Sequence, residues 1–151
     1  MSTSIKKLTL VGCCAVALSL GFGPDAQAGG PFGFGKNAST ADIAKIDIDV
    51  MPDGRGAPPG QGTYAEGKKV YAAQCASCHG ADMAKPVKGT GAAPLRGGRG
   101  TLTSGKPKKT VESYWPYAST LFDFTKRAMP FYEPGSMKDN DIYAVVAYIL
   151  A

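Results

Sequence analysis

The chain has 151 residues, a length typical of one domain, and carries a formal net charge of +5 at pH 7. Its lysines are scattered along the chain rather than clustered with aromatic residues, which argues against nucleic-acid binding. It has one histidine, and only two of its four cysteines lie beyond residue 14, which leaves too few ligands for a zinc site.

Residues 1–28 have the pattern of an export signal. A short positive region precedes an apolar run at residues 8–22, and Ala26-Gln27-Ala28 fits a small-residue cleavage site. We therefore expect cleavage near Ala28 and no membrane span in the mature form. Two alternatives stay open. One is a transmembrane anchor, for which the apolar run is short, and the other is a lipoprotein with Cys13 as the lipidated residue.

Residues 29–62 are expected to form an extended arm. Glycine and proline recur at residues 29–35 and 52–62, which excludes long helices there. Between these stretches lies a partly alternating set of β-branched residues: Ile43, Ile46, Ile48 and Val50. Disordered linkers are poor in such residues, so the arm should pack on its own domain or on a partner protein. A disordered linker is the alternative.

The compact domain is expected to span residues 63–151 and to begin with a helix. Thr63 and Glu66 have the spacing of a capping box, in which each side chain satisfies a backbone amide of the other residue. A glycine inside a helix costs about 1 kcal/mol relative to alanine, so Gly67 predicts the close approach of another helix. The expected partner is the last helix, at residues 139–151, whose apolar residues recur at helical spacing.

The most specific motif is the pentapeptide Cys-Ala-Ser-Cys-His at residues 75–79. The spacing Cys-x-x-Cys-His is the attachment sequence for c-type haem. Two thiols on one helical turn can reach the two vinyl groups of a porphyrin as thioethers, and His79 is then held beneath the iron as its proximal ligand. We therefore predict one covalently attached haem c, bound by Cys75, Cys78 and His79.

Other uses of the cysteine pair are a structural disulfide and a thioredoxin-like redox pair. The redox pair is expected near a βαβ pattern, and none is apparent. An exported chain with this motif fits cytochrome maturation outside the cytoplasm, so the expected location is the bacterial periplasm.

The segment after the motif is expected to be a long loop at residues 80–109. Recurring glycines and prolines prevent regular structure, and a large prosthetic group would give such a loop something to pack against. A further helical region should begin at Thr110 or Ser113, with residues 117–128 as its main body. Pro130 should end it.

The iron needs a second axial ligand, and methionine is the usual choice in cytochromes c. Met83 is too close in sequence to His79 to reach the opposite haem face easily, whereas Met137, just before the last helix, could do so. Met129 is the best candidate, because it follows a helix, precedes Pro130 and is separated from His79 by the long loop. An open or lysine-ligated iron is the alternative.

Further candidates concern the surroundings of the haem. The backbone carbonyl of Pro94 could accept the second ring N–H of His79 and so orient the imidazole. Four side chains could hydrogen-bond the haem propionates: Arg96, Arg99, Trp115 and Tyr117. Each of them could instead be a surface residue or part of the packed loop. No catalytic base or nucleophile dyad is visible beside the motif, so we do not expect an enzyme.

Together these segments resemble a class I cytochrome c over roughly residues 63–151. The resemblance rests on the early helix with Gly67, the pentapeptide, a Pro94-Leu95 loop, Met129-Pro130 and the final helix. It implies an all-α class I cytochrome c fold, here preceded by an extended N-terminal arm, and a role in single-electron transfer.

A narrower resemblance is to the cytochrome subunit of sulfane dehydrogenase, SoxD. The similar stretches are residues 43–54, residues 58–62 and, above all, residues 113–118 followed by 127–131. In that family the cytochrome pairs with a molybdenum-cofactor subunit of the sulfite oxidase type. It takes electrons released by sulfur oxidation and passes them to another cytochrome c. The resemblance implies that the arm at residues 29–62 binds the partner.

The sequence departs from this family in two respects. It has one haem motif where some members carry two, and it stops inside the final helix at Ala151. Related cytochromes also accompany other molybdenum sulfur dehydrogenases. Two other functions therefore stay open: a freely diffusing cytochrome c that serves a terminal oxidase, and a haem enzyme or ligand sensor with an open iron site.

Overall fold

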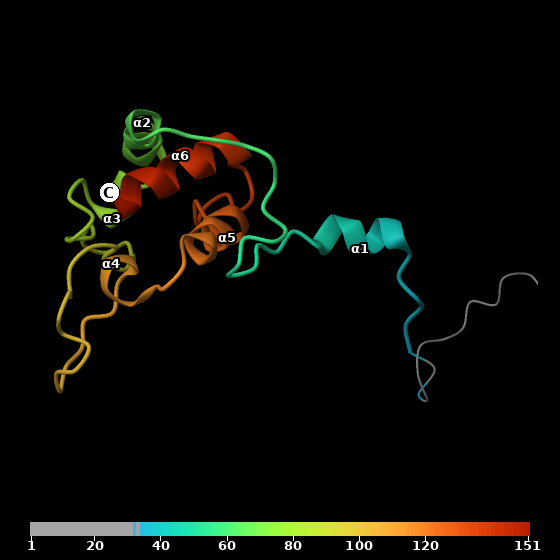
Figure 1. The fold of residues 1–151 in the computed structure, drawn as a ribbon, viewed down its shortest axis with the longest axis horizontal. Helices are drawn as coiled ribbons and strands as arrows, with labels where there is room; N and C mark the ends of the chain where they lie inside the picture. The colour runs from blue at the N-terminus through green and yellow to red at the C-terminus, as the bar shows by residue number, and fades with distance from the viewer. Residues whose placement is uncertain (1–31, 33) are drawn as a thin grey trace, which may run out of the picture. The chain divides into compact units, whose positions relative to one another are not determined.

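The computed structural model describes residue 32 and residues 34–151, so the expected export signal and Cys13 lie outside the described residues. Its helices are α1 (Thr40–Ile46), α2 (Tyr64–Gln74), α3 (Ala76–His79), α4 (Val111–Tyr114), α5 (Ala118–Ala128) and α6 (Asp139–Leu150), shown in Figure 1. The described residues contain no strand, so the predicted all-α fold is confirmed. None of the helices within residues 34–151 is long and apolar enough to cross a bilayer.

Two compact units divide the chain, residues 1–43 and residues 44–151. Within the arm predicted at residues 29–62, residues 40–46 form the short helix α1. Ser39 starts this helix: its hydroxyl accepts the backbone N–H of Asp42 at 3.2 Å and donates to the Asp42 carboxylate at 2.6 Å.

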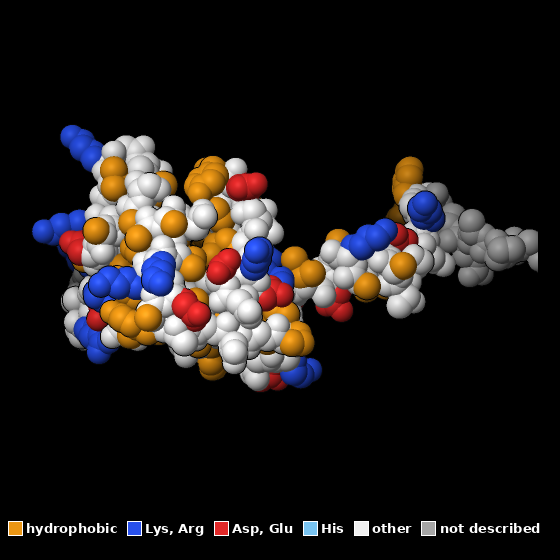
Figure 2. All heavy atoms as spheres, turned by 90° about the horizontal axis from the view of Figure 1, so that it is seen from above, with side chains coloured by type: hydrophobic (Ala, Val, Ile, Leu, Met, Phe, Trp, Pro, Cys, Tyr) orange, Lys and Arg blue, Asp and Glu red, His pale blue; other side chains and the backbone are white. Residues whose placement is uncertain are grey.

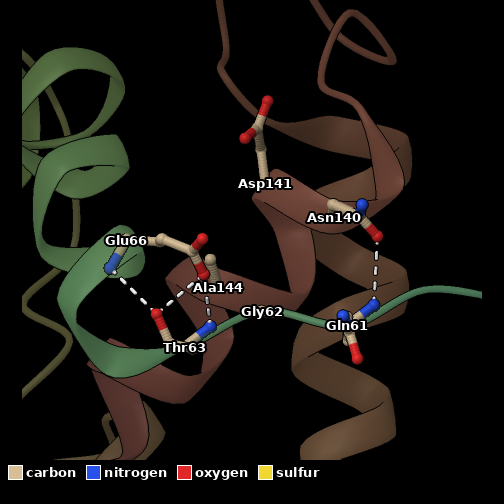
Figure 3. A pocket seen from close by; sticks show the side chains of 7 residues that line it. All are labelled: Gln61, Gly62, Thr63, Glu66, Asn140, Asp141 and Ala144. Carbon is tan, nitrogen blue, oxygen red and sulfur yellow. Dashed lines mark hydrogen bonds between the residues drawn. The ribbon is translucent and has the colours of Figure 1, made fainter.

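Residues 49–62, here called the strap, pack on α5 and α6. Val50 is buried in the core, and its N–H donates to the Asp123 carboxylate on α5 at 2.9 Å. Farther along, the Tyr143 hydroxyl on α6 donates to the carbonyl of Pro58 at 2.7 Å. The Gln61 N–H donates to Asn140 on the same helix at 3.0 Å (Figure 3). The strap is thus part of the folded domain.

The capping box predicted at the start of α2 is present. The Glu66 N–H donates to the Thr63 hydroxyl at 3.3 Å, and the Thr63 N–H donates to the Glu66 carboxylate at 2.9 Å, as Figure 3 shows. These two bonds satisfy donors that the first helical turn leaves without partners. Helix α2 consequently has a fixed starting point, one turn before Gly67.

The predicted crossing of α2 and α6 at Gly67 is also present. A Cβ atom added at Gly67 would lie 1.8 Å from the carbonyl oxygen of Ala144, and one added at Gly62 would lie 2.2 Å from the Ala144 N atom. The ring of Tyr148, one turn later on α6, packs against Tyr64 and Tyr71 with centroids 5.1 and 5.4 Å away. Backbone contact between the two helices is therefore possible only because these positions lack side chains.

The apolar core has two clusters, and α6 contributes residues to both. The first contains Val50, Val111, Leu121, Phe122, Ile142 and Val146, and the second contains Tyr71, Met83 and Val145. Three half-buried residues pack against both clusters: Leu95, Met137 and Ile149. Residues 80–109 contain no helix or strand, as predicted, and Leu95 is the point at which this loop joins both clusters.

A Gly67→Ala substitution should destabilise the domain by about 2 kcal/mol or more. The new methyl group would overlap the Ala144 carbonyl, which belongs to a helix backbone, and this overpacking outweighs the gain of about 1 kcal/mol in helix propensity. Thermal unfolding followed by circular dichroism measures the effect. Gly105→Ala is the matched control, since nothing lies within 4 Å of a Cβ added there. Equal melting temperatures for the two variants would contradict the crossing.

The attachment of the strap should depend on pH through Asp123. Burial raises the pKa of this carboxyl, but hydrogen bonds from Arg127 and from the Val50 amide more than offset it, and the pKa lies below its ordinary value of 3.8. A lowered folded-state pKa stabilises the fold above the unfolded-state value, and this stabilisation is lost as the pH falls through the folded-state pKa.

Asp123→Asn should therefore lower stability at neutral pH and flatten the loss of stability between about pH 5 and pH 2. Urea unfolding across that range measures it. Glu133→Gln, at an exposed loop position, is the control and should keep the wild-type profile. An unchanged profile for Asp123→Asn would show that this carboxylate does not hold the strap.

Candidate haem site

The cysteine pair and His79 lie on one helical turn at the end of α2. Cys75 ends α2 and starts α3, its own N–H donating to the Tyr71 carbonyl at 2.9 Å. The N–H groups of Cys78 and His79 donate to the Cys75 carbonyl at 3.1 and 2.9 Å. Both thiols are free and half-buried, so the pair is not a disulfide in this structure.

The thiol chemistry does not fit a redox-active pair. Burial, and then the neighbouring Cys78, raise the pKa of Cys75 to about 11. The reactive cysteine of a thioredoxin-like pair has a lowered pKa, because the thiolate is the nucleophile. Two free, half-buried thiols three positions apart, followed by a histidine, fit covalent attachment to haem.

The His79 imidazole is oriented by a backbone carbonyl, but not by the one expected. His79 Nδ1 lies 2.8 Å from the carbonyl oxygen of Ala93, which corrects the assignment to Pro94. Ala93 precedes Pro94, and a residue before proline is restricted to extended conformations. Just after Pro94, Leu95 and Arg96 donate their N–H groups to the Met83 carbonyl. With Nδ1 donating to Ala93, Nε2 is the nitrogen left to bind a metal.

A buried tyrosine holds the other end of this turn. The Tyr71 hydroxyl donates to the Gly80 carbonyl at 2.7 Å, and burial raises the pKa of this hydroxyl strongly. Gly80 follows His79 directly and has a φ of +79°, which glycine adopts without strain. The sequence places Tyr71 in the helix but gives no signal for this contact, because the turn after His79 is irregular.

The three methionines after the motif have different environments. Met83 is only 2% exposed and fills the second core cluster with Tyr71 and Val145. Met137 packs against both clusters. Met129 ends α5, is half-buried, and belongs to neither cluster of the described residues. Its thioether is thus the one that core packing leaves available to a ligand.

Three of the four candidate propionate donors gather around one cavity of about 420 Å³, which Arg96, Arg99 and Trp115 line with Glu112 and the end of α6. Arg99 Nε donates to the Glu112 carboxylate at 2.8 Å. The Gly97 amide, and then Arg99, lower the pKa of Glu112. Tyr117 is exposed and does not line this cavity.

Two cysteines three positions apart, followed directly by a histidine, are the attachment pattern of a c-type haem protein. Residues 64–151 match the cytochrome c family model, and the chain belongs to the cytochrome c family. That family implies covalently bound haem c, and its electron-transfer role and the predicted class I fold are thereby confirmed.

Two relatives show the narrower similarity. The chain is 42% identical to a chain of the sulfane dehydrogenase SoxCD from Paracoccus pantotrophus, with a TM-score of 0.67, over 78% of this chain and 56% of that one. It is 33% identical over 93 residues to the thiosulfate dehydrogenase of Stutzerimonas stutzeri (strain A1501). That match covers 61% of this chain and 28% of the relative. The predicted resemblance to the SoxD cytochrome is confirmed.

Proposed function

We propose that this protein is a periplasmic cytochrome with one haem c that accepts single electrons from a molybdenum-dependent dehydrogenase of sulfane or sulfite. A downstream cytochrome c is the proposed acceptor, and the chain itself is an electron-transfer subunit rather than an enzyme. The similarity to the SoxCD chain carries this proposal. It covers 78% of the chain, more than the 88 of 151 residues in the cytochrome c match, so it includes residues before 64.

Each residue of the site would have a separate part in binding the cofactor. Cys75 and Cys78 would bind it through thioethers, and His79, oriented by the Ala93 carbonyl, would bind the iron. When bound, haem c supplies an iron centre that changes charge by one electron. Met129 would complete the ligand set, and methionine ligation favours a higher reduction potential.

The cavity beside Trp115 is suited to the propionates. Arg96 and Arg99 provide positive charge there, and the indole N–H is a further donor. Glu112 lines the same cavity and accepts a hydrogen bond from Arg99 Nε at 2.8 Å. Tyr117 would not take part, since it does not line the cavity.

The segment around α1 has the properties of a partner-binding surface. None of the α1 residues is buried, and Ile43 and Ile46 are 48% and 77% exposed. Apolar side chains are visible at the surface of α1 in Figure 2. Isoleucines three positions apart share one face of a helix, and an exposed apolar face marks an interaction site. The proposed occupant is the molybdenum subunit.

Replacing both isoleucines, Ile43→Ser with Ile46→Ser, should weaken binding of the molybdenum subunit at least tenfold, because each buried isoleucine contributes about 1.5–3 kcal/mol. Co-purification from cells that express both subunits measures it. Leu102→Ser, at another apolar position with 45% exposure, is the matched control. Deletion of the whole arm is a poorer test, since it removes Val50 from the core. Unchanged recovery of the complex would overturn the role of α1, and a monomer with no stable partner would favour a freely diffusing carrier.

Met129→Ala should open the iron to added ligands. The reduced wild-type protein should not bind carbon monoxide, whereas the variant should bind it at once, because the sixth position would lose its thioether. Absorption spectra before and after exposure to the gas measure this. Met137→Leu is the control, since it preserves volume in the core and should remain unreactive. Immediate binding by the wild type would rule out methionine ligation and favour the open-site enzyme or sensor.

A further inference from the structure

The loop between α5 and α6, residues 129–138, is here called the ligand loop because it begins at Met129. An ion pair closes its base: Lys126 Nζ lies 2.5 Å from the Asp139 carboxylate, and both side chains are partly buried. Lys126 stands in the last turn of α5, and Asp139 is the first residue of α6. The two ends of the loop are therefore held together by the helices that flank it.

A second contact ties the loop to the haem-attachment segment. The Tyr132 hydroxyl donates to the side-chain oxygen of Gln74 at 2.8 Å, across 58 positions of sequence. Gln74 is the last residue of α2 and directly precedes Cys75. A turn presents Tyr132 for this contact, since the Glu133 N–H donates to the Pro130 carbonyl at 2.9 Å.

The contact is a specific link rather than part of the core. Tyr132 is 66% exposed, and the neighbouring Phe131 is 83% exposed, so neither ring is held by core packing. Met137 fixes the far end of the loop by packing against both core clusters. Between Met129 and Met137, the Tyr132–Gln74 hydrogen bond joins the described loop residues to α2.

We propose that Tyr132 is a positioning residue for the iron's methionine ligand. By bonding to Gln74, it ties the loop that carries Met129 to the segment that carries the haem cysteines, and so limits how far Met129 withdraws from the iron. This inference rests on the proposed ligation by Met129. It assigns the hydroxyl of Tyr132, rather than its ring, to the control of ligand displacement.

The test is displacement of the methionine by imidazole in the oxidised holoprotein. An added ligand binds only when Met129 leaves, so its apparent affinity reports how firmly the loop is held. Tyr132→Phe keeps the ring and removes the hydrogen bond. This hydrogen bond is exposed to solvent, so its free-energy contribution should lie at the low end of the usual range for hydrogen bonds. We therefore expect imidazole to bind the variant about two- to fivefold more tightly than the wild type. Spectral titration through the methionine–iron charge-transfer band measures this affinity.

Tyr64→Phe is the matched control, because this tyrosine is 52% exposed and lies on α2. Its imidazole affinity should equal that of the wild type. Gln74→Leu should reproduce the effect of Tyr132→Phe, and the double variant should add nothing further, since both changes remove the same bond. Urea unfolding of the same variants should show a change in the free energy of unfolding that is smaller than the change in the free energy of imidazole binding. This comparison separates positioning from general stability.

Wild-type affinity in Tyr132→Phe, or full additivity in the double variant, would overturn the positioning role while leaving methionine ligation intact. A wild-type protein without the charge-transfer band would instead overturn the ligation itself. The charge-transfer band therefore distinguishes the two failures: it is present if only the positioning role is wrong and absent if the ligation is wrong.

Discussion

The backbone contact between α2 and α6 is the constraint on which the rest of the structure depends. Gly62 and Gly67 bring the start of α2 against Ala144, and Tyr148 then packs beside Tyr71 one turn further on. This crossing fixes the direction of α2, and the capping box at Thr63 fixes where the helix begins. A helix with both its start and its direction fixed delivers its last residue to a defined place, and the residue after it is Cys75.

From this point the haem site is built by local backbone bonds. In one helical turn, the N–H groups of Cys78 and His79 donate to the Cys75 carbonyl. Where this turn ends, the Tyr71 hydroxyl donates to the Gly80 carbonyl. The orientation of the His79 imidazole is set by a residue farther along the chain, through its hydrogen bond to the Ala93 carbonyl. Helix geometry therefore sets the positions of Cys75, Cys78 and His79, whereas the long loop at residues 80–109 sets the orientation of the His79 ring.

The sequence predicted the features that depend on neighbouring residues or on periodicity. The capping box, the close approach at Gly67, the final helix and the haem pentapeptide all have local signals. It could not predict contacts made by irregular backbone. The carbonyl that accepts from His79 differs by one residue from the expected Pro94, because a loop's register follows from tertiary packing. The sequence left open whether the arm packs on its own domain or on a partner, because no local pattern shows that Val50 bonds to Asp123, 73 positions away.

His79 and Met129, the proposed ligands of the iron, are consequently held by very different means. His79 stands on a helical turn whose backbone bonds and buried tyrosine leave it little freedom. Met129 stands at the start of a loop whose exposed aromatic residues contribute little packing, and its restraint comes from contacts at the loop's ends and from Tyr132. Regions with few buried contacts open at lower free energy than the core. With the proposed ligation, ligand exchange at the iron should therefore begin on the methionine side, and the residues that tie the ligand loop would determine how readily it occurs.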